Sequence, residues 1–175
     1  MRTLLLTIIT LLTTFSCSEK KEKIKDIREL EYIFISRRGQ LDTIYRETKY
    51  HFKSDTMDII TYKTIWAENE YEESFEFSKS KDRVVNNIKL VDQKIIDFEG
   101  QAYIIYKYLM DNPDGDDEEM LYFYSPRYGI LIDKAAWWGN YDKLTDYGNP
   151  KDNRIIYYLT EMITNDDKDF YINWK

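Results

Sequence analysis

Segments rich in β-branched and aromatic residues follow one another along most of this chain, and short turns separate them. Two of the turns have clear chemistry: Gly100 favours a tight hairpin, and Pro126 presets the backbone of another turn. Because the connections are too short for crossover helices, consecutive segments are expected to pair antiparallel, as a meander of seven to nine strands. The segments expected as strands are 32–35, 41–52, 57–66, 73–79, 94–98, 102–110, 121–124 and 129–133.

One segment near the C-terminus has helical rather than strand periodicity. Asn149 and Pro150 are typical of an N-cap and a first helical residue, and the pattern ends near Asn165. The apolar face of the expected helix consists of Ile155, Ile156, Leu159, Met162 and Ile163. After the helix, residues 170–174 are expected as an edge strand or a loose tail.

The predicted fold class is therefore α+β. The main part is an antiparallel β meander, which forms a curved sheet, a half-barrel or a flattened barrel. The C-terminal amphipathic helix is expected to pack its apolar face on that sheet. No internal repeat or linker divides the chain, so the 175 residues are expected to contain one folded domain.

Composition narrows the classes of function. The formal net charge of -7 argues against nucleic-acid binding, which needs a clustered basic excess. A single cysteine excludes an internal disulfide, and a single histidine, His51, excludes the common multi-histidine zinc sites. No metal and no cofactor are therefore expected. His51 has no Cys, Asp or Glu beside it at metal-ligand spacing, and we assign it no role.

The N-terminus has the composition of an export signal. Arg2 supplies a positive charge, and the uncharged, mostly apolar stretch 4–15 has the length of a signal-peptide core. This stretch is shorter than the roughly 20 residues that a membrane-spanning helix needs. The composition changes to charged residues just after Cys17. The sequence therefore predicts a cleaved signal over 1–16.

The residues at the end of this signal, Thr13-Thr14-Phe15-Ser16-Cys17, resemble the lipobox of bacterial lipoproteins. The resemblance implies cleavage between Ser16 and Cys17, a diacylglycerol on the Cys17 thiol, and an acyl chain such as palmitate on the new α-amine. It also implies a cell-envelope protein that contacts the membrane through this anchor. Ser18, where some lipoproteins have Asp, favours the outer membrane, on its periplasmic face or at the cell surface. The resulting division is a signal peptide over 1–16, a lipidated cysteine and polar tether over 17–29, and a single globular domain over 30–175.

An acidic run over 111–119 is the most conspicuous polar feature of the expected domain. Its carboxylates suit Ca²⁺, which prefers oxygen ligands, but Met110 and Leu121 would occupy ligand positions of an EF-hand loop. The tripeptide 113–115, Pro-Asp-Gly, instead favours a turn between two strands. A solvated loop is the preferred interpretation, and a weak cation site is the alternative.

Four aromatic residues gather just before the expected helix: Trp137, Trp138, Tyr141 and Tyr147. In an exposed groove, such rings stack on sugars or hold apolar ligands, because one end of a Tyr or Trp side chain tolerates water. In a small β domain, however, aromatic residues more often form the core and its rim. We prefer the second interpretation for most of them.

We predict a non-catalytic envelope lipoprotein that serves as a ligand-binding or structural module, with a small apolar molecule, a sugar or a protein as its partner. The alternatives are a protein-interaction or inhibitor module of the immunity type and, less favoured, an envelope hydrolase. An aromatic-lined cavity would favour ligand binding, and a flat acidic patch would favour a protein partner. Two carboxylates facing each other in a cleft would favour a hydrolase.

Overall fold

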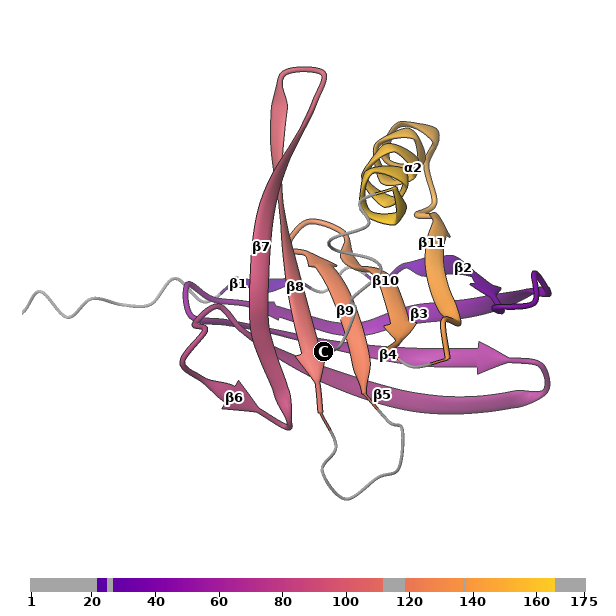
Figure 1. Cartoon of the computed structure of the whole chain (residues 1–175), viewed down its shortest axis with the longest axis horizontal. Coiled ribbons are helices and arrows are strands. Elements are labelled where there is room, and N and C mark those ends of the chain that lie inside the picture. The colour runs from indigo at the N-terminus through magenta and orange to yellow at the C-terminus, as the bar shows by residue number, and fades with distance from the viewer. Residues whose placement is uncertain (1–21, 25–26, 112–118, 137, 166–175) are drawn as a thin grey trace, which may run out of the picture.

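The computed structural model describes residues 22–24, 27–111, 119–136 and 138–165. Within these ranges it shows eleven strands and one helix (Figure 1). The strands are β1 (Glu22–Ile24), β2 (Glu29–Ile35), β3 (Leu41–Lys53), β4 (Met57–Trp66), β5 (Asn69–Ser78), β6 (Val84–Val85), β7 (Ile88–Phe98), β8 (Gln101–Met110), β9 (Met120–Ser125), β10 (Gly129–Ala135) and β11 (Tyr141–Asp146), and the helix is α2 (Pro150–Thr164). In this part of the chain, no helix is long and apolar enough to cross a bilayer.

The strands form one antiparallel sheet with the order β5-β4-β3-β2-β11-β10-β9-β8-β7-β6, and β1 adds to β3. Consecutive strands are neighbours in two meanders, β2 to β5 and β6 to β11, and the pairing of β2 with β11 joins the meanders. The sheet bends until β5 contacts β6 and β7 at its other end. It is therefore a nearly closed, barrel-like sheet, and the predicted fold class is confirmed (Figure 1).

Aromatic side chains fill the space between the two meanders. Phe77 of β5 is fully buried, and its ring centroid lies 4.6 Å from those of Tyr108 on β8 and Tyr124 on β9. Aromatic pairs of this kind contribute about 0.5–1.5 kcal/mol beyond the area that they bury. They hold β5 against the opposite meander although the two edges of the sheet do not pair through their backbones.

The helix α2 forms where the sequence predicts it. The Asn149 side chain accepts a hydrogen bond of 2.9 Å from the backbone N–H of Asp152, Pro150 is the first helical residue, and Asn165 is the C-cap. A side-chain N-cap stabilises a helix by about 1 kcal/mol. The predicted edge strand or tail over 170–174 lies outside the described residues.

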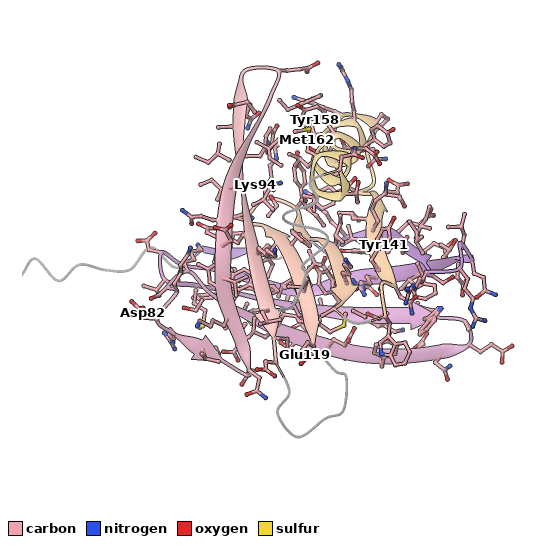
Figure 2. The ribbon with its side chains drawn as sticks, viewed as in Figure 1. Asp82, Lys94, Glu119, Tyr141, Tyr158 and Met162 are labelled. Carbon is pink, nitrogen blue, oxygen red and sulfur yellow. The ribbon has the colours of Figure 1, made fainter. Side chains whose placement is uncertain are left out.

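The apolar face of α2 packs on β7, β10 and β11. Its buried residues include the predicted Ile155, Ile156, Leu159 and Ile163. The prediction for Met162 is wrong: its side chain is 44% exposed, and Thr160 is buried on the other flank of the face. Tyr158 lies beside the β7–β8 hairpin (Figure 2), and its ring centroid is 4.7 Å from that of Phe98.

The structure corrects the predicted strands in two respects. Tyr141–Asp146 form β11, the strand that joins the meanders, although the sequence indicated only an aromatic cluster there. The strands β5 and β7 begin at Asn69 and Ile88, earlier than the predicted starts. In addition, Glu22–Ile24 of the predicted tether pair with the end of β3.

Candidate functional site

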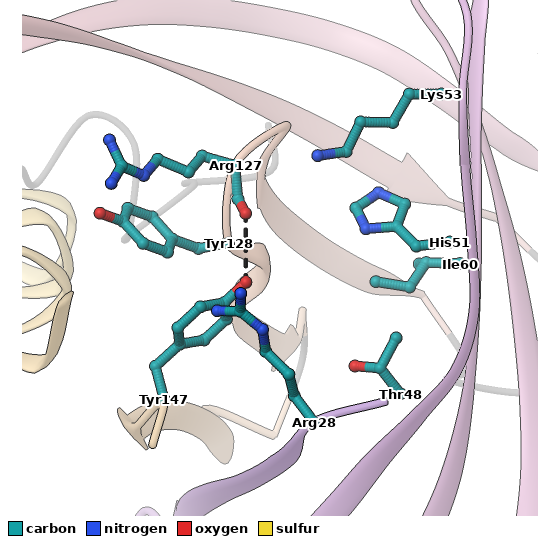
Figure 3. A pocket seen from close by; sticks show the side chains of 8 residues that line it. All are labelled: Arg28, Thr48, His51, Lys53, Ile60, Arg127, Tyr128 and Tyr147. Carbon is teal, nitrogen blue, oxygen red and sulfur yellow. Dashed lines mark hydrogen bonds between the residues drawn. The ribbon is translucent and has the colours of Figure 1, made fainter. Parts of the chain in front are cut away.

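A small cavity of about 160 Å³ opens at the end of the barrel where β3 ends (Figure 3). Five separate segments of the chain supply its walls: β3, β4, the β9–β10 turn, the residue before β2, and the connection from β11 to α2. The lining residues are Arg28, Thr48, His51, Lys53, Ile60, Arg127, Tyr128 and Tyr147. We refer to this cavity as the basic pocket.

A β-bulge in β3 brings His51 into the pocket wall. The register of β3 on β4 shifts between Thr48 and Tyr50. Before the shift, Arg46 and Thr48 are buried, and after it the burial moves to the odd-numbered position His51. A bulge inserts one residue into the alternation and so reverses which side chains face inward. Without it, His51 and Lys53 would lie on the opposite face from Thr48.

The β9–β10 turn forms another wall, and its close approach to β4 depends on a glycine. Gly129 has a φ of +82°, and a Cβ atom there would lie 2.5 Å from the Tyr62 hydroxyl. The Tyr62 hydroxyl accepts a hydrogen bond of 3.3 Å from the backbone N–H of Ile130. Because Gly129 allows this approach, Arg127 and Tyr128 are held at the mouth of the basic pocket.

His51 is 7% exposed, and it belongs to a series of polar contacts. Its Nε2 atom lies 3.1 Å from the Tyr124 hydroxyl, which donates to Oδ2 of Asp58 at 2.8 Å. The Lys79 ammonium lies 2.9 Å from Oδ1 of the same carboxylate. Since the single phenol proton goes to Asp58, His51 must donate from Nε2. Its Nδ1 atom is then a hydrogen-bond acceptor.

Two pKa shifts determine the protonation states of Tyr124 and His51 in this series of contacts. Burial, together with the Asp58 carboxylate, raises the pKa of Tyr124 well above its usual value, so the phenol keeps its proton. Burial, followed by the positive charges of Lys53 and Lys79, lowers the pKa of His51 from 6.5 to about 3. His51 is therefore a neutral imidazole at neutral pH.

The stability of the protein should depend on pH through His51. Below pH 6.5 the unfolded chain takes up a proton on this residue, whereas the folded protein does not until about pH 3. The stabilising contribution of neutral His51 is therefore complete above pH 6.5 and decreases as the pH falls towards 3, by up to about 1.4 kcal/mol for each pH unit. His51→Gln keeps a donor but cannot titrate. Urea unfolding from pH 7 to pH 4 should show a steeper loss for the wild type, and parallel curves would contradict the assignment.

Positive charge surrounds the pocket. Arg28 lies over the Tyr147 ring, with its guanidinium carbon 4.6 Å from the ring centroid, and the Tyr147 hydroxyl donates to the Arg127 carbonyl at 3.2 Å. The Arg127 guanidinium turns towards α2, where it lies 3.4 Å from the Asp152 carboxylate. Figure 3 shows Lys53 and Arg28 extending into the pocket from different sides. None of the eight lining residues is acidic.

A second group of charges lies inside the barrel and has a structural role. The Arg46 guanidinium contacts Asp133 at 2.6 Å and Asp142 at 2.9 Å, and it lies over the Tyr32 ring at 4.3 Å. Burial and the neighbouring Asp133 carboxylate raise the pKa of Asp142. The side chains of Asp133 and Asp142 are 9% and 13% exposed. They join β3 to β10 and β11 and are not the open carboxylate pair that a hydrolase needs.

The structure describes only some of the residues that the sequence singled out. Cys17 and Ser16, residues 112–118 of the acidic run, and Trp137 lie outside the described residues. Trp138 is 59% exposed and lines an open hollow beside the β2–β3 turn, whereas Tyr147 lines the basic pocket. Among the residues that the structure describes, no cluster of three His, Cys, Asp or Glu side chains could hold a metal ion.

The sequence interpretation missed the basic residues of the pocket. Arg28, Lys53 and Arg127 come from three distant parts of the chain, so no local motif marks them as one group. His51 was left without a role and now lies at the centre of the site. Comparison with known proteins supplies no further guide, because no protein-family model, no curated protein and no solved structure matches this chain.

Proposed function

We propose that this chain is a non-catalytic lipoprotein of the bacterial cell envelope, anchored through lipid on Cys17, whose β domain holds a small ligand in the basic pocket. The anchor is inferred from the signal-like residues 1–16 and the lipobox-like residues before Cys17. The outer membrane is the proposed location, on the strength of Ser18. The ligand site is inferred from the geometry of the pocket.

The observation that carries the ligand-binding proposal is the convergence of five segments on one cavity in a domain whose interior is filled by aromatic rings. A volume of about 160 Å³ is below the roughly 300–1,000 Å³ of pockets that enclose a drug-sized molecule. It fits a small polar molecule or one end of a larger one. The charged lining makes the apolar ligand of the sequence prediction a poor fit.

The first described strand, β1, lies close to both the pocket and the proposed anchor at Cys17. Glu22 pairs with Lys53, and Ile24 pairs with His51, so the chain enters the domain beside the pocket. The five residue-to-residue steps from Cys17 to Glu22 span at most about 18 Å. With acyl chains on Cys17, the pocket end of the barrel is held close to the bilayer surface. A ligand at or near that surface is within its reach.

Two variants of β3 test whether the pocket holds a ligand. Thr48→Trp should fill the cavity, whereas Thr43→Trp places the same side chain on the same strand outside it. In native mass spectrometry of protein extracted from envelopes, the wild type and Thr43→Trp should carry a small bound molecule that Thr48→Trp lacks. Addition of an envelope extract should also raise the thermal midpoint of the wild type and of Thr43→Trp, but not that of Thr48→Trp. Equal behaviour of all three proteins would contradict a ligand site in this pocket.

A further inference from the structure

We propose that the ligand of the basic pocket is a neutral sugar or polyol, one hydroxyl of which donates a hydrogen bond to Nδ1 of His51 (Figure 3). This inference rests on the proposed function and names the chemistry of its ligand. The hydrogen-bonding groups of the pocket determine this ligand class more than its charges do, because Arg28 and Lys53 interact with other parts of the protein. The Arg28 charge also acts on the Asp152 carboxylate.

Contacts outside the pocket determine which nitrogen of His51 carries the proton. The Lys79 ammonium lies 2.9 Å from Oδ1 of Asp58, and Oδ2 of the same carboxylate accepts the Tyr124 phenol proton at 2.8 Å. The Tyr124 oxygen, 3.1 Å from Nε2 of His51, is therefore left to accept from that nitrogen. Nδ1 carries a lone pair and no proton. A ligand that meets this atom must donate a hydrogen bond to it.

Two polar groups in the pocket wall lack a partner. His51 and Thr48 are 7% and 8% exposed, so both residues are more than nine-tenths buried. Within the part of the chain that the structure describes, neither Nδ1 of His51 nor the Thr48 hydroxyl forms a hydrogen bond. Both side chains extend from β3 into the pocket (Figure 3). Since buried polar groups rarely stay unpaired, the two favour a ligand that forms a hydrogen bond with each.

Other polar ligands fit this pair of groups less well. An ionised carboxylate or phosphate group has only acceptors, and its lone pairs would meet the lone pair of Nδ1. An ammonium group donates, but burial and the charges of Lys53 and Lys79, which lower the pKa of His51 to about 3, disfavour a positive charge at this place. A hydroxyl is neutral, and it both donates and accepts. Two hydroxyls on adjacent carbons can therefore pair with Nδ1 and with the Thr48 hydroxyl together.

The size and the remaining walls of the pocket suit such a molecule. A water molecule takes about 30 Å³ in the liquid, so a cavity of about 160 Å³ has room for a small polyol or one sugar ring. Ile60 and the Tyr128 ring supply the apolar part of the wall. The Tyr128 hydroxyl donates to Asp152 at 3.0 Å, which leaves the ring as a surface for C–H groups.

Calorimetry tests the ligand class on protein purified from envelopes in a polyoxyethylene detergent, which has no sugar headgroup. The hydroxyl probes are glycerol, myo-inositol, glucose, galactose and N-acetylglucosamine. Acetate, inorganic phosphate and acetamide are the comparison compounds. At least one hydroxyl probe should bind the wild type more tightly than all three comparison compounds do, and Thr48→Trp should bind none of them. If a sugar binds, its methyl glycoside distinguishes the source: equal binding supports the end of a glycan, and lost binding supports a free sugar.

Substitutions in β3 test the two hydrogen bonds. His51→Gln keeps an N–H near the position of Nε2 and removes the acceptor at Nδ1, so it should weaken the best hydroxyl probe about tenfold. His51→Asn places an amide oxygen near the position of Nδ1 and should keep most of the affinity. Thr48→Val removes only the hydroxyl and should also weaken binding, whereas Thr43→Val, outside the pocket on the same strand, should change it less than about twofold. The thermal midpoint shows that each variant is folded.

Analogues of the ligand provide the same test in the unchanged protein. Replacement of one hydroxyl of the best probe by fluorine removes a donor at that position. One such analogue should bind the wild type at least about tenfold more weakly than the parent probe does, because it cannot donate to Nδ1. In His51→Gln the same analogue and its parent should bind equally, since the acceptor is absent.

The outcomes separate this inference from the proposed function. Failure of every hydroxyl probe to bind, tighter binding of acetate, phosphate or acetamide, or equal affinity of His51→Gln and the wild type overturns the inference. A bound molecule without hydroxyl groups that is lost in Thr48→Trp would also overturn it and leave the proposed binding function standing. Equal behaviour of the wild type, Thr43→Trp and Thr48→Trp in native mass spectrometry would remove both.

Discussion

Leu159→Asp should lower the free energy of unfolding by about 4 kcal/mol or more, which is a large part of the stability of a domain of this size. Leu159 is fully buried in the middle of the apolar face of α2, between the helix and the sheet. A carboxylate there loses its hydration and gains no partner, and the Leu side chain loses its packing. Chemical denaturation of the purified variant measures the change.

Tyr157→Ser is the matched control on the same helix. Tyr157 is 65% exposed, and the Lys143 ammonium lies 5.8 Å from its ring centroid. We expect a loss below about 1 kcal/mol, since exposed positions contribute little. Equal thermal midpoints for Leu159→Asp and Tyr157→Ser would contradict the orientation of α2 on the barrel.

The elements with strong local patterns could be predicted from the sequence. The N-cap at Asn149, the proline after it and the apolar spacing through Ile163 placed α2 correctly, because these signals lie within one segment. The boundaries of β4 were also predicted, since Met57–Trp66 is rich in β-branched and aromatic residues. Local propensity and tertiary structure agree in both places.

The strand that completes the sheet could not be predicted, and the reason is electrostatic. Asp142 and Leu144 are the buried residues of β11, and the Asp142 carboxyl group has a buried partner 2.9 Å away, the Arg46 guanidinium of β3. A strand whose inward positions include a carboxylate does not show an apolar alternation. Its partner lies almost a hundred residues earlier in the chain, where no local pattern reveals it.

The basic pocket could not be predicted from the sequence for a related reason. Its walls come from five segments, and the inward position of His51 depends on a bulge that no sequence pattern predicts. Arg28 and Lys53 each look like ordinary surface cations in the sequence. Only the pairing of the strands brings their side chains to one cavity. The site therefore follows from topology and not from a motif.

Cys17→Ser should move the protein from the membrane fraction to an uncleaved precursor or a released form. If the lipobox-like residues are recognised, Cys17 is both the acylation site and the cleavage position, and Ser supplies no thiol for the lipid. Each buried CH₂ group of an acyl chain contributes about 0.8 kcal/mol, so several chains give effectively permanent attachment. The redistribution should be nearly complete. The control is Ser18→Ala, which leaves the thiol in place and should remain in the membrane fraction.

The folded domain should be unaffected by Cys17→Ser, since Cys17 precedes every strand that the structure describes. The thermal midpoint of the variant should equal that of the wild type. A large loss of stability would show that the change acts through folding and not through the anchor.

Mass spectrometry of the mature wild-type N-terminus, combined with membrane fractionation, tests the proposed lipid-anchored protein most directly. We predict a chain that begins at Cys17, carries the mass of a diacylglycerol and an additional acyl chain, and is found with the membranes. An unmodified N-terminus at any other residue, on a protein found in the aqueous fraction, would contradict the anchor, the location and the placement of the pocket near the bilayer.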